Sequence, residues 1–152
     1  MRSKFNLIAL TLAVGLGAAS CGSSKTSAPV TAVPVTSAAA AAAANYQLLA
    51  PTAADALLRD PPNKLVVLDV RTPAEFAAGH IAGAIDIDLT AATFAGEAAK
   101  LDPQTPYLVY CHSGNRSAQA VAFLKQHGFK SIYELQGGIA AWQAAGLPVV
   151  AG

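Results

Sequence analysis

The sequence predicts an α/β domain built on a mostly parallel sheet, and two observations lead to this class. Short runs rich in strand-favouring residues alternate with segments that carry helix signals, which is the pattern of a parallel sheet covered by helices. About a hundred residues remain once the N-terminal segments are set aside, enough for one compact domain and too few for two. We therefore expect a single layered sandwich.

Four runs supply the predicted strands. Each is short, apolar and rich in residues that favour extended backbone. They are Leu65–Leu68, Ala84–Ile87, Tyr107–Tyr110 and Ser131–Leu135.

The first helix is predicted from a capping box at Thr72-Pro-Ala-Glu75. The Thr72 side chain is expected to accept from the amide of Glu75, whose own side chain reaches back to Thr72. Pro73 occupies the first helical position, where no amide donor is needed, and Gly79 ends the helix after one or two turns.

Two further helices follow the last two strands. Ser117–His127 is stopped by Gly128 and places four apolar residues on one side, namely Ala118, Val121, Ala122 and Leu124. Its other side carries Gln119, Lys125 and Gln126. The final helix, Ile139–Ala145, is closed by Gly146 and sealed by Pro148.

The N-terminus has the layout of a secretory signal peptide. Arg2 and Lys4 precede an apolar stretch, Leu7–Leu16, which is followed by the small residues 17–20. The apolar stretch is shorter than the roughly 20 residues that a membrane-spanning helix needs. Residues 1–20 are therefore expected to be a signal peptide rather than a permanent anchor.

Cys21 directly follows Ala-Ala-Ser, which resembles the lipobox of bacterial lipoproteins, although Ala18 stands where leucine is usual. This resemblance implies that Cys21 is lipidated and becomes the first mature residue. The protein is then expected in the bacterial cell envelope or periplasm, anchored to a membrane by that lipid. The alternative is an ordinary signal peptide with Cys21 as an unmodified thiol.

Residues 22–45 are rich in Ser, Thr, Pro, Val and Ala and include the alanine run Ala38–Ala44. This composition cannot bury enough apolar surface to offset the entropy of ordering, so it predicts a disordered tether before a domain at 46–150. From Tyr46 onward seven basic side chains stand against nine acidic ones, a net charge of −2. No basic stripe is present, so we expect no nucleic-acid partner.

The candidate active site centres on Cys111, where the strand Tyr107–Tyr110 gives way to a helix that begins near Arg116 or Ser117. The unpaired amides of the first turn and of the small-residue loop can point toward one centre there. Such a cradle would lower the pKa of Cys111, whose thiolate is the reactive form, and would hold anions. Gly114 lets the loop turn tightly, Ser113 and Ser117 offer hydroxyls, and Arg116 adds a planar cationic fork.

Four segments in succession resemble the motifs of a single-domain rhodanese, and the resemblance covers Tyr46–Val150. They are Asp69-Val-Arg71, Glu75-Phe-Ala-Ala-Gly-His80-Ile-Ala-Gly83-Ala84, Tyr110-Cys-His-Ser-Gly-Asn-Arg116-Ser117 and Gly137-Gly138-Ile-Ala-Ala-Trp142. The resemblance implies a layered sandwich whose mostly parallel central sheet has helices on both faces.

The resemblance also implies a sulfurtransferase. Cys111 would take sulfane sulfur from a small anionic donor such as thiosulfate or polysulfide, carry it as a persulfide, and yield it to cyanide or a thiol. The substrate would be held by the loop residues His112, Ser113, Gly114, Asn115, Arg116 and Ser117. No metal-ligand cluster or nucleotide-type glycine loop is present, so no metal or cofactor is expected.

The chain departs from the family pattern in three places. Ala82 replaces a frequent proline, His112 stands where many members carry arginine or another polar residue, and the second domain of the tandem enzymes is absent. A histidine changes charge near neutral pH, so attraction for a dianion would depend on pH. Only four residues separate Cys111 from Arg116, whereas phosphatases and arsenate reductases with a related loop use five, so phosphatase chemistry is disfavoured.

Each candidate also has a structural interpretation. Cys111 could be a small buried hydrophobe, or could pair with Cys21 in an oxidising compartment unless lipidation consumes that thiol. Four other residues are expected to brace loops, with Asp69 or Arg71 as candidates for the pocket rim; the four are Asp69, Arg71, Glu75 and His80. Gly137, Gly138 and Trp142 are interpreted as a turn and a packing anchor.

A second functional class stays open. The domain could be a non-enzymatic persulfide carrier or a redox-sensing interaction module of the envelope, with an unknown protein partner.

Overall fold

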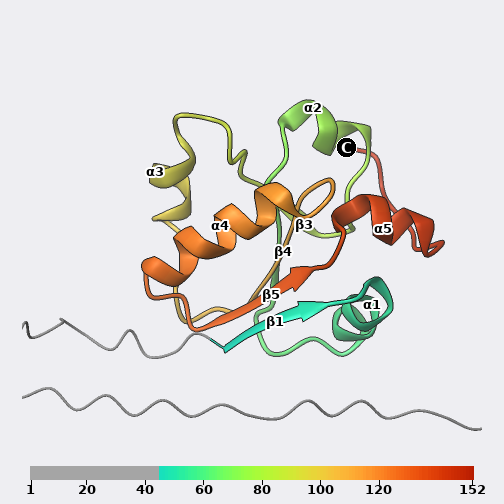
Figure 1. The fold of residues 1–152 in the computed structure, drawn as a ribbon, viewed down its shortest axis with the longest axis horizontal. Coiled ribbons are helices and arrows are strands. Elements are labelled where there is room, and N and C mark those ends of the chain that lie inside the picture. The colour runs from blue at the N-terminus through green and yellow to red at the C-terminus, as the bar shows by residue number, and fades with distance from the viewer. Residues whose placement is uncertain (1–44) are drawn as a thin grey trace, which may run out of the picture. The chain divides into compact units, whose positions relative to one another are not determined.

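The structure, a computed structural model, describes residues 45–152, which form a five-stranded sheet with five helices (Figure 1). In chain order the elements are β1 (Asn45–Leu49), α1 (Pro51–Arg59), β2 (Val66–Asp69), α2 (Pro73–Ala78), β3 (Ala84–Asp86), α3 (Phe94–Ala98), β4 (Tyr107–Tyr110), α4 (Asn115–Gln126), β5 (Ser131–Leu135) and α5 (Gly138–Ala144). All four predicted strands are therefore present, two of them with the predicted bounds.

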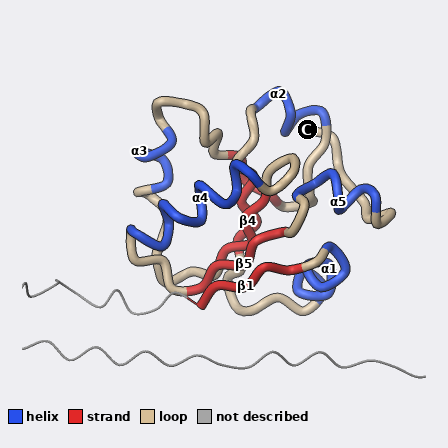
Figure 2. Tube along the Cα trace, in the orientation of Figure 1, coloured by secondary structure: helices blue, strands red, loops and turns tan. Residues whose placement is uncertain are grey.

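The strands follow the order β1-β5-β4-β2-β3, and every neighbouring pair is parallel. Figure 2 shows β1, β5 and β4 side by side. Because parallel neighbours need crossover connections, helices cover the sheet. One core cluster joins α3 and α4 to Leu68 and Val109, and a second joins α1 and α5 to Val67 and Leu108. The predicted parallel sheet with helices on both faces is confirmed.

The central strand β4 is buried along its whole length, as a strand covered on both faces must be. Its side chains alternate between the two clusters, with Tyr107 and Val109 in one and Leu108 and Tyr110 in the other. Cys111 follows directly and belongs to the first cluster. The candidate nucleophile therefore stands at the carboxyl end of the central, fully buried strand.

Three elements were not predicted: β1, α1 and α3. Four of the five residues of β1 are exposed, so this edge strand has no apolar run to signal it. Helix α3 is only five residues long and contains Gly96. Helix α1 did carry a signal, a proline at its first position, Pro51.

The predicted helix at α2 is confirmed, whereas the predicted start and buried side of α4 differ from those observed. Both halves of the capping box between Thr72 and Glu75 are present, and Gly79 is the C-cap. Helix α4 begins at Asn115, two residues earlier than predicted, and Ala118 and Ala122 are exposed rather than on the buried side. Its buried residues are Ser117, Ala120, Val121 and Leu124.

The predicted signal peptide, the lipidated Cys21 and nearly all of the predicted tether lie outside the described residues. Of the tether only Asn45 is described, and it opens β1. Among the helices of residues 45–152, none combines the length and hydropathy that a membrane span requires.

Candidate active site

Cys111 lies where β4 ends and the loop to α4 begins, at the carboxyl edge of the sheet. Ligands of open parallel sheets bind beyond this edge. The residue is 1% exposed and takes part in no disulfide within the described chain. Burial alone agrees with a small core residue, so the groups that face the sulfur decide between the two interpretations.

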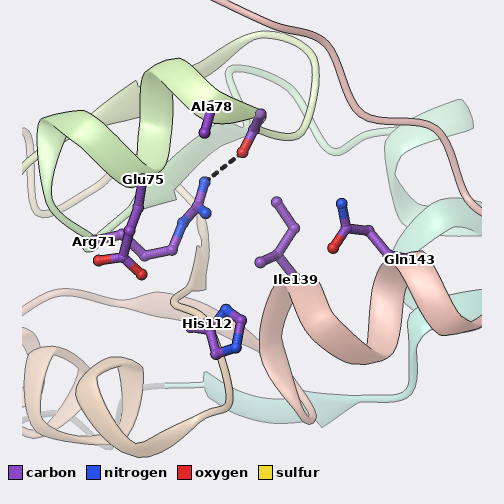
Figure 3. A pocket seen from close by; sticks show the side chains of 7 residues that line it. Arg71, Glu75, Ala78, His112, Ile139 and Gln143 are labelled. Carbon is purple, nitrogen blue, oxygen red and sulfur yellow. Dashed lines mark hydrogen bonds between the residues drawn. The ribbon is translucent and has the colours of Figure 1, made fainter.

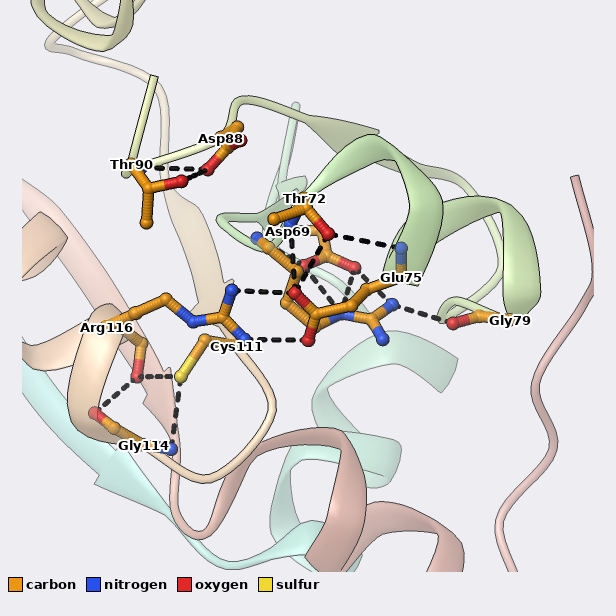
Figure 4. Close-up of polar contacts among 11 residues, drawn as sticks. Asp69, Thr72, Glu75, Gly79, Asp88, Thr90, Cys111, Gly114 and Arg116 are labelled. Carbon is orange, nitrogen blue, oxygen red and sulfur yellow. Dashed lines mark hydrogen bonds and ion pairs between the residues drawn. The ribbon is translucent and has the colours of Figure 1, made fainter. Parts of the chain in front are cut away.

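Polar groups of the loop do face the sulfur (Figure 4). The Gly114 amide donates to Cys111 Sγ at 3.1 Å, and the Ser117 hydroxyl oxygen lies 3.7 Å from Sγ. Gly114 has a φ of 103°, a conformation open to glycine, and this turns its amide inward. A purely apolar role for Cys111 does not explain these contacts.

Burial raises the pKa of the Cys111 thiol, and the surrounding donors lower it. The amide and hydroxyl of Ser117 together with the amides of Gly114 and Ser113 outweigh burial, so the net shift is downward. The sulfur also lies close to the N-terminus of α4, where the helix dipole stabilises a negative charge. The site therefore favours a thiolate although little water reaches it.

The first turn of α5 packs against the backbone of the Cys111 loop. The Ile139 amide donates to the Cys111 carbonyl at 2.8 Å, and the Ala140 amide donates to the His112 carbonyl at 3.1 Å. A Cβ on Gly138, whose φ is 61°, would overlap both carbonyl groups. Gly138 thus belongs to the site, a role beyond the turn that its sequence predicted.

Arg116 does not face an empty pocket; it pairs with Glu75 (Figure 4). Its Nη1 and Nη2 each donate to one carboxylate oxygen at 2.7 Å. These bonds are the main cause that lowers the pKa of Glu75 to about 2, opposed by burial and helped by Thr72. The two residues are 41 positions apart, and nothing in the sequence pattern joins them.

Asp69 and Arg71 form a second ion pair, which is buried. Arg71 Nε donates to both Asp69 oxygens, and Nη2 donates to Asp69 and to the Gly79 carbonyl, each at 2.7 Å. The pair thereby joins the end of β2 to the end of α2. Asp69 is fully buried and does not reach the rim, whereas Arg71 does.

A pocket of about 300 Å³ opens between α2, the Cys111 loop and α5 (Figure 3). It is lined by Arg71, Glu75, Ala78, Gly79, His112, Ile139 and Gln143. Of the predicted substrate residues only His112 lines it, while Ser113 and Asn115 are exposed and do not belong to the lining. Cys111 is not part of the lining, but its chain neighbour His112 is.

A buried carboxylate on the other side of the loop was missed by the sequence analysis. Glu134, 4% exposed, accepts from the Ser117 hydroxyl and from the Tyr46 hydroxyl, both at 2.7 Å. A charged residue at a buried position of a strand was the one available signal, since strand interiors rarely hold an unpaired acid.

The remaining residues act in the scaffold. His80 stacks on Phe76, and its Nδ1 lies 3.0 Å from the Phe76 carbonyl oxygen. Its backbone bridges to Val150, which ties the C-terminal segment to α2. Trp142 is buried and donates to the Pro148 carbonyl.

Comparisons with known proteins agree with this geometry. The family model described as "Rhodanese-like domain" matches residues 50–145. A sulfurtransferase of Allochromatium vinosum is 38% identical over 87 residues, which cover 57% of this chain and 79% of that protein. The thiosulfate sulfurtransferase GlpE of Pseudomonas aeruginosa is 38% identical over 99 residues, covering 65% and 86%.

Two solved structures extend the likeness to the fold. A rhodanese-related protein from Thermoplasma volcanium has a TM-score of 0.62 and 34% identity, covering 70% of this chain and all of that one. A Rhodopseudomonas palustris protein of unknown function, described as a possible tyrosine phosphatase, has a TM-score of 0.57 and 28% identity, covering 69% of this chain and 85% of that one. The chain belongs to the rhodanese-like family of sulfurtransferases.

Proposed function

We propose that this domain transfers sulfane sulfur through a persulfide on Cys111, with thiosulfate or a polysulfide as donor and cyanide or a thiol as acceptor. The observation that carries the proposal is the Gly114 amide directed at Cys111 Sγ at 3.1 Å, at the start of α4. A donor in this position stabilises a thiolate before reaction and a charged persulfide after it.

In the first half-reaction the Cys111 thiolate attacks the outer sulfur of the donor. With thiosulfate, a new S–S bond forms to Cys111, the sulfur–sulfur bond of the donor breaks, and sulfite leaves with the electron pair. The pocket beside His112 is where we place the departing anion, since Arg71 and His112 line it. Loop amides then hold the negative terminal sulfur.

In the second half-reaction a nucleophilic acceptor attacks the terminal sulfur, and the Cys111 thiolate leaves with the electron pair of the S–S bond. Cyanide would give thiocyanate, and a thiolate would give a new persulfide. Because no dedicated base is needed once the thiolate exists, the chemistry depends on the donors around the sulfur. Arg116 adds positive charge nearby, although Glu75 occupies its fork.

The length of the loop favours sulfur transfer over phosphate-ester hydrolysis. Four residues lie between Cys111 and Arg116, and the resting loop already directs its Gly114 amide at the sulfur. This enclosure suits one added sulfur atom and is cramped for a tetrahedral oxyanion on Cys111. We expect no turnover of aryl phosphates.

Steady-state turnover tests the proposal. The purified protein should form thiocyanate from thiosulfate and cyanide with ping-pong kinetics, and Cys111→Ser should lower kcat/KM by on the order of a thousandfold or more. Serine is close to cysteine in size, so circular dichroism should show an intact fold. Undiminished turnover in this variant would overturn the role of Cys111.

A persulfide carrier is the alternative, and the same assay separates it from an enzyme. A carrier would accept one sulfur per chain from a donor, lose this ability in Cys111→Ser, and show no repeated cycles with cyanide or small thiols. Repeated cycles support the transferase.

We also propose that the protein is exported and held at a membrane by a lipid on Cys21, with residues 22–44 as the tether. The charged start, short apolar stretch and Ala-Ala-Ser-Cys sequence support this address. Cells fed a fatty-acid analogue should label the protein, and Cys21→Ser should abolish labelling. Labelling that persists in this variant would exclude Cys21 as the lipid site.

A further inference from the structure

Three groups compete for the single hydrogen of the Ser117 hydroxyl: the Glu134 carboxylate, the Gly114 carbonyl oxygen and, once it is ionised, the Cys111 sulfur. The hydroxyl oxygen lies 2.7 Å from Glu134 Oε1 and 3.7 Å from Cys111 Sγ, a length typical of a contact with sulfur, and also 2.9 Å from the Gly114 carbonyl oxygen. A serine hydroxyl donates one hydrogen and accepts through its lone pairs. It therefore cannot donate to a Glu134 carboxylate and to a Cys111 thiolate at the same time.

Two arrangements of the protons link Cys111 to Glu134 through Ser117 with the same heavy-atom positions. In one, the Cys111 thiol donates to Ser117, and Ser117 donates to the Glu134 carboxylate. In the other, protonated Glu134 donates to Ser117, and Ser117 donates to the Cys111 thiolate. The second differs from the first by one proton passed from sulfur to the serine oxygen and one passed from that oxygen to Oε1, so the net charge stays at −1.

Because Cys111, Ser117 and Glu134 are all buried, it matters that the three side chains together carry one negative charge and not two. Cys111 is 1% exposed, Ser117 is fully buried and Glu134 is 4% exposed. Two negative charges that both contact one hydroxyl in such a place would repel strongly, because little solvent screens them. No cation forms a salt bridge with Glu134 among residues 45–152.

The groups that surround the cluster do not remove this coupling. From β1 the Tyr46 hydroxyl donates to Glu134 Oε2, and from α4 the Lys125 ammonium lies over the Tyr46 ring rather than on the carboxylate. On the loop side Arg116 is held by Glu75, and His112 points to the pocket. Ser117 is thus the contact through which Glu134 and Cys111 act on each other.

We propose that Glu134 is a positioning residue for sulfur transfer, which exchanges one proton with Cys111 through the Ser117 hydroxyl so that the thiolate forms without a second buried charge. The role of Glu134 in sulfur transfer rests on the proposed function. The shared proton itself is a property of the resting protein and can be measured without any sulfur donor.

Glu134→Gln is the decisive variant, because the orientation of its amide is set by neighbours. Tyr46 donates to the oxygen that replaces Oε2, which leaves the amide N–H directed at Ser117. Glutamine then imitates protonated Glu134 permanently, and the Ser117 hydrogen is released from the carboxylate to the Cys111 thiolate, with the uncharged Gly114 carbonyl as the competing acceptor. The variant retains size and both hydrogen bonds while removing the exchangeable proton.

The thiolate is followed by its ultraviolet absorbance across pH, as the difference between each protein and its Cys111→Ser counterpart. Coupled sites titrate in shared steps, so the wild type should show two steps. Glu134→Gln should show one step, with its midpoint about one unit or more below the upper step of the wild type. Identical single steps in both proteins would overturn the proposal.

Two controls separate this role from a merely structural one. Glu75→Gln removes a glutamate from the other side of the loop and should retain both steps. In a Ser117→Ala background the Glu134→Gln shift should shrink, since the hydroxyl that transmits it is gone. A shift of full size in that background would show a direct field effect and would contradict transfer through Ser117.

Infrared spectroscopy of the wild type gives a readout that needs no variant of Glu134. The S–H band and the protonated-carboxyl band should both lose intensity in both steps. If the carboxyl band disappears entirely in the lower step and the S–H band entirely in the upper one, no proton is shared. Loss of sulfur uptake with intact two-step titration would instead contradict the proposed function alone.

Discussion

Two glutamates flank the first turn of α4 and are held in opposite ways. Glu75 approaches from the pocket side, with its side chain 33% exposed, and both oxygens bind the Arg116 guanidinium. Glu134 approaches from the core side, is 4% exposed, and among residues 45–152 its side chain binds only the hydroxyls of Ser117 and Tyr46. A carboxylate neutralised by a cation braces the loop, whereas one without a cation remains coupled to the thiol.

The difference shows that proximity to the candidate catalytic cysteine does not fix the role of an acid. Glu75 and Arg116 cancel most of each other's charge, so their pairing mainly fixes the position of α2 against α4. Glu134 has no such compensation within the described residues, and the Ser117 hydrogen is the group that it shares with Cys111. Substitutions at Glu75 and at Glu134 should therefore have different effects on stability and on the titration of Cys111.

The largest effect is expected from breaking the loop on which both glutamates act. Gly138→Ala would place a Cβ against the carbonyl groups of Cys111 and His112 and would force an unfavourable positive φ on alanine. Backbone cannot move aside as a side chain can, so we expect a loss of about 3 kcal/mol or more in the free energy of unfolding. Denaturant unfolding measures it.

Gly96→Ala is the matched control for Gly138→Ala. A Cβ at Gly96 meets nothing within 4 Å, and the residue lies inside α3 with ordinary helical backbone. Alanine should therefore stabilise the protein by about 0.5 to 1 kcal/mol. Equal losses from both substitutions would show that the close contact of Gly138 with the Cys111 loop does not restrict the residue at this position.

The next effect compares the two glutamates directly. Glu134→Ala leaves the buried Ser117 hydroxyl without its 2.7 Å acceptor and should cost about 2 to 3 kcal/mol. Glu75→Ala removes half of a capping box and a solvent-accessible ion pair, and should cost about 1 kcal/mol. A greater loss from Glu75→Ala, measured by denaturant unfolding, would reverse the assignment of buried and exposed roles.

The loss of folding stability at low pH tests the contribution of Glu75. Because Arg116 lowers its pKa from 4.5 to about 2, the pair contributes stability that is fully present above pH 4.5 and is lost as pH falls toward 2. Solvent screens this half-exposed pair, so the contribution is about 1 kcal/mol. Glu75→Gln keeps a capping side chain but should flatten this part of the stability curve, and an unchanged slope would exclude the pair as its source.

Salt should produce the smallest and most diagnostic difference. Glu75→Gln unmasks Arg116 and should lower the thiolate midpoint by less than about half a unit at low ionic strength, with the shift vanishing near 1 M salt. The Glu134→Gln shift should persist at high salt, because buried charges are screened much less. Two shifts with the same salt dependence would erase the distinction between the two sides.

Local signals gave most of the fold. The capping box at Thr72 and the apolar run Tyr107–Tyr110 are encoded within a few residues, so they could be predicted with their bounds. Strand β1 could not, because an edge strand with four exposed residues gains its structure from pairing with β5, far along the chain.

The candidate site divides in the same manner. Cys111 and the loop that supplies its hydrogen-bond donors lie within seven consecutive residues, so the residue types of the loop were enough to predict them as a candidate site. The partners that set their charge state come from elsewhere: Glu75 is 41 positions from Arg116, and Tyr46 is 88 positions from Glu134. No spacing rule reaches across such distances, and only the fold shows that Arg116 is already paired.

The central claim is that the donors around Cys111 maintain a nucleophilic sulfur that carries one further sulfur atom. Mass spectrometry of the purified protein after incubation with thiosulfate tests it most directly. The account predicts a gain of one sulfur on the peptide containing Cys111, its removal by cyanide, and no gain in Cys111→Ser. An unmodified Cys111 peptide at saturating thiosulfate and polysulfide would contradict it.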